Sequence, residues 1–336
     1  MSTLDAETPL TAAAGFGRGR LVTVFGGSGF LGRHVVRALA RRGWRVRAAV
    51  RRPDLAGHLQ PLGSVGQIQP VQANLRYRSS VDAAVAGADA VVNLVGILAP
   101  SGRQSFDAVQ AFGARAVAEA ARGAGIDTLV HVSAIGADAA SKSDYARSKA
   151  AGEAAVRETV PGAVILRPSI VFGPEDGFFN RFADMARFAP VLPLIGGGET
   201  LFQPVYVADV AEAVARSLEG GATLGATYEL GGPDVVSFRR CLEMVLAETG
   251  RQRPLLPIPF AVAERLAGLT DWLPGAPITR DQVELLKSDN VVSDAATTAG
   301  RTLAGLGIKP HSLASVLPSY LYRYSRQGQF DRHKAV

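Results

Sequence analysis

Three polar residues near the middle of the chain have the types and spacing that proton transfer requires. Tyr145 and Lys149 are four residues apart, so a helix would place the phenol and the ammonium on one face. A nearby ammonium favours the phenolate, and we expect Lys149 to lower the pKa of Tyr145 toward a useful acid–base range. Ser133 ends an apolar run typical of a parallel strand, where such sheets bind ligands. Ser133, Tyr145 and Lys149 are therefore the candidate catalytic residues.

A glycine cluster near the N-terminus has the spacing of a dinucleotide-binding turn. Gly26, Gly29 and Gly32 follow the apolar run 21–26 and open a segment with helical periodicity. Such glycines allow a tight turn, a close approach of the backbone to a pyrophosphate, and close packing of helix on strand. The N–H groups at the helix N-terminus then face the phosphates. The cluster predicts a dinucleotide site.

Two arginines indicate which dinucleotide is preferred. A site for NADH usually places an acidic residue about 20 residues after the glycines, where it holds the ribose 2′-hydroxyl. Here Arg51 and Arg52 end the second expected strand, and no acidic residue occurs between 18 and 53. A guanidinium suits a 2′-phosphate, with which it forms bidentate hydrogen bonds. We expect NADPH (NADP+) in preference to NADH; the alternative is that both arginines point to solvent.

Alternating strand and helix patterns must bring these residues together. Strands that are apolar on both faces and alternate with helices are typical of a parallel sheet covered on each side. Six strands predict a doubly wound, Rossmann-type α/β sheet, to which the chain returns with a further strand at 227–230. The six expected strands are 21–26, 45–50, 68–72, 90–95, 128–133 and 163–167.

The 336 residues correspond to about two structural units. We expect a nucleotide-binding domain and a smaller, mainly helical C-terminal unit for substrate binding or docking. The polar, aperiodic N-terminus predicts a disordered lead-in, and the last residues predict a flexible basic tail. The predicted boundaries are 1–17 for the lead-in, 18–172 for the Rossmann domain (completed by about 205–232), 173–204 and 233–325 for the C-terminal unit, and 326–336 for the tail.

Three local patterns lie within the C-terminal unit. Helical periodicity over 237–249 ends at Gly250, which is typical of a helix stop. The segment 254–260 (PLLPIPF) is predicted to be an extended connection interrupted by prolines. Thr279 and Gln282 have the spacing of a capping box, which predicts a helix start.

Composition excludes several classes of protein. Apolar residues make up 47% and charged residues 20% of the chain, as in globular proteins. A single cysteine, Cys241, excludes a disulfide framework and a multi-cysteine metal site, and we expect no metal. No apolar run reaches the roughly 18–20 residues of a spanning helix, and the N-terminus does not have the pattern of a signal peptide. We expect a soluble protein.

The net charge of +6 comes from two basic blocks. Residues 18–53 hold ten arginines and no acid, and residues 301–336 hold six lysines and arginines against Asp331 alone. Basic blocks attract phosphates, anionic lipid or nucleic acid. The phosphates of a dinucleotide explain the first block, so we expect no nucleic-acid partner. For the second block we expect an anionic membrane surface, with ordinary surface charge as the alternative.

The motifs identify a family resemblance. In chain order, GGSGFLG, RRPD, NLVG, HVSAIGA, YARSK and LRPSIVFGPED resemble the extended or atypical short-chain dehydrogenases/reductases, with Ser133, Tyr145 and Lys149 on the catalytic positions. The longer stretch from YARSK onward, with QPVYVADVAEAV and ITRDQVELLKSDNVV, is similar to the NADPH-binding accessory subunit of respiratory complex I and its bacterial relatives. In that group the nucleotide is held as a structural element.

The resemblance implies a set of residues around the nucleotide. Tyr145 and Lys149 would hydrogen-bond the nicotinamide ribose even without catalysis. Asn74 departs from the pattern, because many relatives carry an aspartate there that faces the adenine. The implied cofactor-binding residues are Gly26, Gly29, Phe30, Leu31, Gly32, Arg51, Arg52, Asn74, Leu75, Leu94, Val95, Gly96, Tyr145, Lys149, Pro168 and Ile170.

Three functions of different classes remain. The favoured one is an NADPH-binding, non-catalytic accessory subunit, or an assembly or stability factor, of respiratory complex I. The second is an active NADPH-dependent reductase, epimerase or dehydratase, since the Ser-Tyr-Lys set suits both. The third and weakest is a nucleic-acid-binding relative. The favoured function implies complex I subunits as partners and a peripheral place on the cytoplasmic side of a bacterial inner membrane, or on the matrix side of a mitochondrion.

The C-terminal unit from Pro254 onward is expected to face the membrane or the membrane arm of the complex. The second basic block has no internal use in this interpretation, and apolar residues lie close to it in the sequence. An interfacial segment combines both features. The alternative is that these apolar residues close a small core. They are Leu255, Leu256, Ile258, Phe260, Leu266, Leu269, Trp272 and Leu273.

Overall fold

A seven-stranded sheet is the centre of the larger part of the molecule. The computed structural model describes residues 17, 19–100, 102, 105–270 and 278–326; the expected lead-in up to residue 16 and the tail beyond 326 lie outside the described residues. All strand pairs of this sheet are parallel, in the order β11-β6-β5-β4-β1-β2-β3. The doubly wound Rossmann-type sheet is confirmed. Its strands are β1 (Leu21–Phe25), β2 (Arg45–Val50), β3 (Ile68–Gln72), β4 (Ala90–Asn93), β5 (Leu129–Val132), β6 (Val164–Pro168) and β11 (Thr227–Leu230).

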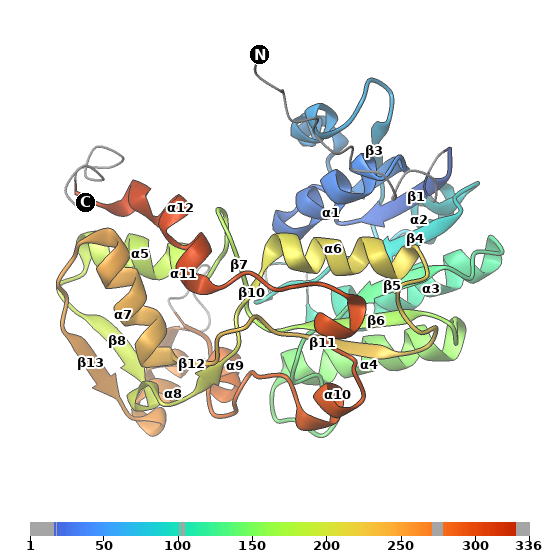
Figure 1. Ribbon diagram of the computed structural model, residues 1–336. Coiled ribbons are helices and arrows are strands. Elements are labelled where there is room, and N and C mark those ends of the chain that lie inside the picture. Colours follow the sequence, from blue (N-terminus) through green and yellow to red (C-terminus); the bar gives the residue numbers. More distant parts are fainter. Residues whose placement is uncertain (1–16, 18, 101, 103–104, 271–277, 327–336) are drawn as a thin grey trace, which may run out of the picture.

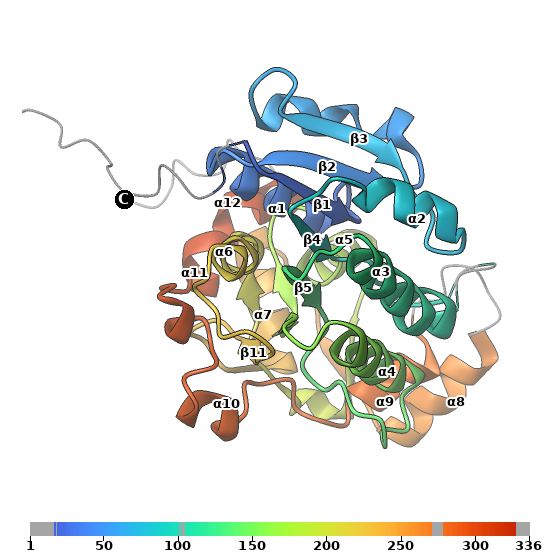
Figure 2. The same cartoon turned by 90° about the vertical axis from the view of Figure 1, so that its right-hand side faces the viewer.

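Helices cover both faces of this sheet (Figure 1, Figure 2). Strand side chains alternate between the faces, so β1 contributes Val22 and Val24 to one apolar core and Phe25 to the other. Because both faces are buried, the strands are apolar throughout. One face is covered by α1 (Phe30–Arg41) and α6 (Val207–Leu218), and the other by α2 (Arg78–Val85), α3 (Phe112–Gly123) and α4 (Asp144–Thr159).

A smaller, mainly helical region lies beside the sheet (Figure 1). Two further apolar clusters form its core, one around Phe172 and Phe179 and one around Leu192 and Leu242. Its helices are α5 (Phe179–Phe188), α7 (Phe238–Thr249), α8 (Phe260–Thr270), α9 (Arg280–Leu285), α11 (Leu313–Val316) and α12 (Pro318–Leu321). Short strand pairs complete it: β7 (Val171–Phe172) with β10 (Val205–Tyr206), β9 (Leu201–Phe202) with β12 (Val236–Ser237), and β8 (Leu192–Ile195) with β13 (Leu255–Ile258). The short helix α10 (Asp294–Thr298) lies near β11 (Figure 1).

Two of the three local predictions in this region are confirmed and the third is confirmed in part. α7 ends at Gly250, whose φ of 61° is left-handed, and α9 begins at a capping box formed by Thr279 and Gln282. The segment 254–260 is extended as predicted, but it is more than a connection, because it contains β13, which pairs in parallel with β8. Pro257 lacks an N–H, and a two-stranded sheet tolerates it because each strand has a free edge.

Residues 313–323 pack inside the molecule, contrary to the expectation for the second basic block. Leu313, Leu317 and Leu321 are buried in the cluster around Phe179. Arg323 donates hydrogen bonds to the carbonyl oxygen of Pro174 and to Asn180 Oδ1. The expectation that this basic block has no internal use is therefore wrong for Arg323, because the last helices bring it against the loop after β7.

Candidate functional site

The glycine turn between β1 and α1 has the geometry that the sequence predicted. Gly26 has a φ of 81°, which favours glycine, and a Cβ on Gly32 would collide with the carbonyl oxygen of Gly26. Helix α1 therefore packs directly on the turn. Its N-cap, Gly29, has no side chain to bind the N–H groups of the first turn. These groups fit an anionic group such as a pyrophosphate.

A pocket of about 350 Å³ opens over this turn. It follows the carboxyl ends of β1, β2, β3 and β4, where open parallel sheets bind ligands. The predicted cofactor residues that line it are Gly26, Gly29, Phe30, Leu31, Gly32, Arg51, Asn74, Leu75, Leu94, Val95 and Gly96. The remaining ones, which do not line it, are Arg52, Tyr145, Lys149, Pro168 and Ile170.

The two arginines after β2 differ in their surroundings. Arg51 lines the pocket, whereas Arg52 forms a bidentate pair with Asp54, with Nη2 and Oδ2 2.6 Å apart. Arg76 lines the pocket as well, and sequence reasoning missed it. The signal was a basic residue two positions after Asn74, whose side-chain oxygen accepts from the backbone N–H of Arg76 at 3.2 Å. Ser28, inside the glycine motif, was also missed.

Lys149 lies next to the pocket and connects the three candidate catalytic residues, because it is close both to the Tyr145 ring and to Val132, the neighbour of Ser133. Lys149 Nζ donates to the carbonyl oxygen of Val132, at 3.4 Å, and lies 5.9 Å from the centre of the Tyr145 ring. A Cβ on Gly96 would be 3.1 Å from the same Nζ, so the ammonium is next to the pocket wall. Ser133 Oγ is buried and makes no hydrogen bond of ordinary length among the described residues, although it is close enough to Glu153 to help lower the pKa of that carboxyl.

The pKa values of Tyr145 and Lys149 differ from what the sequence predicted. Burial, followed by the negative charge of Asp281, raises the pKa of Tyr145 to about 12. Burial also lowers the pKa of Lys149 to about 8, although the charge of Glu153 opposes this shift. The expectation that Lys149 lowers the pKa of Tyr145 is therefore wrong for this structure. Desolvation of the phenol outweighs the attraction of an ammonium that is itself buried.

Glu153, one turn after Lys149 on α4, completes the buried polar group. Its carboxylate accepts two hydrogen bonds of 2.8 Å from Arg167 on β6 and one of 3.0 Å from Arg157. Burial acts to raise the pKa of Glu153, but Arg167, Ser133 and the charge of Arg157 together outweigh it and lower the pKa. Glu153 therefore places a charged carboxylate one helical turn from Lys149. The sequence analysis did not identify this residue.

Two features are absent from the part of the chain that the structure describes. None of its helices has both the length and the apolar character needed to cross a bilayer. It also contains no cluster of three or more histidine, cysteine or acidic side chains arranged to hold a metal ion. Cys241 is buried.

Comparison with known proteins is consistent with this geometry. Residues 22–231 match the NAD dependent epimerase/dehydratase family. The chain is 36% identical over 322 residues to the mitochondrial NADH dehydrogenase (ubiquinone) 1 alpha subcomplex subunit 9 of Arabidopsis thaliana, covering 92% of this chain and 79% of that protein. It is 32% identical over 314 residues to the mitochondrial NADH-ubiquinone oxidoreductase 40 kDa subunit of Neurospora crassa, with 93% and 82% covered.

Among solved structures, the dTDP-glucose 4,6-dehydratase of Streptomyces venezuelae with NAD and TYD bound has a similar fold. The TM-score is 0.69 at 21% identity, and the match covers 92% of this chain and 98% of that chain. The glycine turn, the strand order and the pocket over the sheet edge all agree with such an NAD(P)-binding fold. The chain belongs to the NAD dependent epimerase/dehydratase family.

Proposed function

We propose that this protein is an NADPH-binding, non-catalytic accessory subunit, or an assembly or stability factor, of respiratory complex I. Similarity to complex I subunits over more than nine-tenths of the chain carries this proposal. The pocket over the glycine turn supports the nucleotide part, because it offers uncapped N–H groups and two arginines in one place.

The charges around the pocket support NADPH over NADH. Arg52 is already paired with Asp54, which leaves Arg51 and Arg76 as the arginines of the pocket. Both are exposed, so a 2′-phosphate can reach either guanidinium. Among the residues that the structure describes, none with an acidic side chain lines the pocket to hold a free 2′-hydroxyl.

The surroundings of Tyr145 support a structural role for the nucleotide. A bound nicotinamide nucleotide supplies hydride chemistry, and a reductase of this family pairs that chemistry with a tyrosine that readily gives and takes a proton. Here the pKa of Tyr145 is raised to about 12, so the phenol keeps its proton and acts as a hydrogen-bond donor. With Lys149 beside it, the pair suits two ribose hydroxyls.

An active reductase, epimerase or dehydratase is the second candidate. It is favoured by the position of Lys149, which is close to the Tyr145 ring, to the neighbour of Ser133 and to the pocket wall at Gly96. A cellular substrate that is reduced by the wild type and not by the Tyr145→Phe variant would favour this candidate.

The C-terminal region is proposed to face the membrane or the membrane arm of the complex. Several of its apolar side chains are exposed, among them Leu256 at 51% and Val262 at 45%. Leu255, Ile258 and Phe260 pack against the core instead, so only part of the predicted apolar set is available for docking. Trp272 and Leu273 lie outside the described residues. A peripheral place on the bacterial inner membrane, or on the matrix side in mitochondria, follows from this proposal.

Native purification tests the proposed function. The tagged chain is expressed from its own locus, membranes are solubilised gently, and the extract is separated by size. We expect the chain to migrate with NADH:quinone reductase activity, and its deletion to lower the amount of assembled complex. Migration apart from that activity, together with an unchanged amount of complex in the deletion strain, would contradict the proposal.

A further inference from the structure

An aspartate of the C-terminal region caps the helix that carries Tyr145 and Lys149. Asp281 Oδ1 accepts a hydrogen bond of 2.7 Å from the backbone N–H of Asp144, and Oδ2 accepts one of 3.0 Å from Ser143 Oγ. Ser143 is the N-cap of α4, and the N–H of Asp144 is the first of that helix, so it has no partner within the helix. A carboxylate also interacts favourably with the positive end of the helix dipole.

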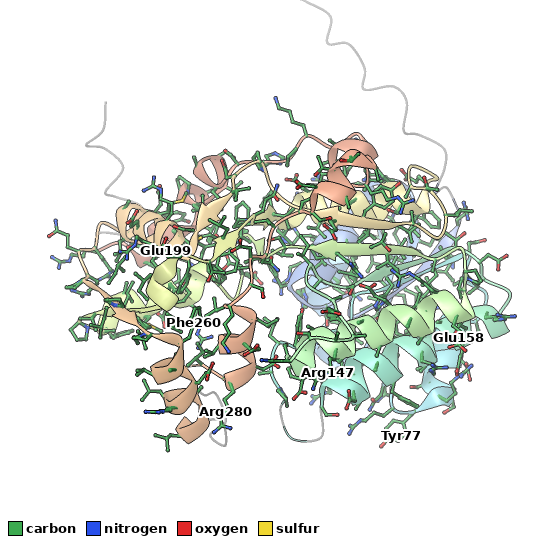
Figure 3. All side chains as sticks on the ribbon, turned by 90° about the horizontal axis from the view of Figure 1, so that it is seen from below. Tyr77, Arg147, Glu158, Glu199, Phe260 and Arg280 are labelled. Carbon is green, nitrogen blue, oxygen red and sulfur yellow. The ribbon has the colours of Figure 1, made fainter. Side chains whose placement is uncertain are left out.

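Asp281 is held firmly in its own helix. The capping box of Thr279 and Gln282 starts α9 directly around it, and Val283 is fully buried in the core of the C-terminal region. Figure 3 shows α9, which carries Arg280, between α8 and the start of α4, which carries Arg147. The carboxylate of Asp281 therefore transmits the position of the C-terminal region to the first turn of α4.

Tyr145 follows the capped residue directly in the chain. Its ring packs edge-on against Phe106, with ring centres 5.9 Å apart, so the first turn of α4 and this contact together determine where the phenol lies. The charge of Asp281 is also close enough to contribute to the raised pKa of Tyr145, after burial. Both effects keep a protonated phenol at one place beside the pocket.

We propose that Asp281 is a positioning residue through which the C-terminal region holds Tyr145 in place for a nucleotide bound in the pocket. This inference rests on the nucleotide binding of the proposed function. Because coupling between two sites is reciprocal, a bound nucleotide stabilises the contact between α9 and α4 by the same amount.

A double-mutant cycle on the full chain tests this role, with NADPH affinity measured by calorimetry. Asp281→Ala is expected to weaken NADPH binding about tenfold in the wild-type background. In a Tyr145→Phe background the same substitution should cost less than twofold, since the hydroxyl that it positions is already absent. Asp281→Asn keeps the size of the side chain, and it replaces Asp281→Ala in the same cycle if that variant does not fold.

A matched control is available in the same region. Asp289 Oδ1 accepts from the backbone N–H of Leu201 at 2.8 Å and is not hydrogen-bonded to α4, so Asp289→Ala should change NADPH affinity less than twofold. An equal loss from the Asp281 substitution in both backgrounds would indicate a merely structural role and overturn the inference alone. A wild-type chain that does not bind NADPH would overturn the proposed function, and this inference with it.

Discussion

Arg51 and Arg52 are neighbours in sequence with different surroundings. Arg51 lines the nucleotide pocket, whereas Arg52 is paired with Asp54 at the surface. Hydrogen bonds to a charged group contribute about 1.5–3 kcal/mol. We therefore expect Arg51→Asp to weaken NADPH binding at least about tenfold and NADH binding only slightly, as measured by calorimetry.

Arg52→Asp introduces the same change of charge one residue later and is the matched control for Arg51. Arg52→Asp should reduce the affinity for NADPH less than Arg51→Asp does, because in the wild type the Arg52 guanidinium is already bound to Asp54. Equal affinity of the wild type for the two nucleotides would refute the assignment of a 2′-phosphate site.

Lys149 should make the free energy of unfolding change with pH in the alkaline range. Burial lowers its pKa in the folded state to about 8, from an ordinary value of 10.5. Between these values the unfolded chain binds more protons than the folded one, so stability rises with pH. The unfavourable contribution is fully present below pH 8 and is relieved above it.

The Lys149→Met variant isolates this contribution. From pH 8 to pH 10 the unfolding free energy of the wild type should rise by about 2 kcal/mol relative to that of the variant. Lys309 is exposed, and Lys309→Met should show no such trend. Denaturant unfolding at several pH values measures both differences, and parallel curves for wild type and Lys149→Met would contradict the expected burial.

Residue types and spacing were sufficient to predict the glycine turn and the Ser-Tyr-Lys set, but not their electrostatics. The sequence places Lys149 four residues after Tyr145, and this spacing predicts a lowered pKa for Tyr145. The raised pKa depends on burial and on Asp281, which is 136 positions further along the chain. Such a contact exists only after the two regions pack together, and a local pattern cannot show it.

Gly32, the third glycine of the motif, lies in the first turn of α1, and its contact with the turn after β1 requires a glycine there. A Cβ on Gly32 would meet the backbone of both Gly26 and Gly27, and backbone atoms cannot rotate away. Gly32→Ala is therefore expected to destabilise the protein by about 1–3 kcal/mol and to abolish nucleotide binding. Thermal unfolding and calorimetry measure the two effects.

Gly29→Ala is the control for this turn. Its φ of −73° is accessible to alanine, and the new Cβ would lie 3.4 Å from the carbonyl oxygen of Gly26. It should cost less than about 1 kcal/mol of stability. If both variants melted at the wild-type temperature, close packing of α1 on the turn would not be essential.

Helices and strands with a regular hydrophobic pattern could be predicted from the sequence, and those without one could not. The sheet strands are apolar on both faces and alternate with amphipathic helices, so their order along the chain predicted the parallel sheet. β13 was missed because Pro257 interrupts its apolar run, and only pairing with β8 stabilises it. α8 was not predicted either.

The last helices that the structure describes complete a core of the smaller region. Leu313, Leu317 and Leu321 are buried in the cluster around Phe179, α12 packs against α5 and α7, and Tyr320 Oη donates to Asp176 Oδ2 at 2.6 Å. Burying a leucine side chain contributes about 1.5–3 kcal/mol. Truncation after Pro310 should therefore unfold the C-terminal region, while truncation after Arg326 should leave the melting temperature unchanged. A truncated chain that ends at Pro310 and melts like the wild type would disprove this packing.

Docking of the whole molecule is best tested by substitutions that leave its cores intact. Leu256 and Val262 are exposed on the C-terminal region, at 51% and 45%, and an interfacial contact would bury them. The double substitution Leu256→Ser with Val262→Ser should keep NADPH binding and release part of the protein from the membrane fraction. Leu224, exposed at 72% in the loop between α6 and β11, provides the control: Leu224→Ser should stay attached.

The dependence on salt separates the two forces that such docking would combine. Attraction of basic residues to anionic lipid is screened at high ionic strength, whereas burial of apolar side chains is not. The wild type should therefore lose part of its attachment when salt is raised, and the double variant should lose nearly all of it, since only the charged contribution remains. If the double variant stays with the membrane fraction as fully as the wild type at low and at high salt, this face of the C-terminal region is not the docking surface.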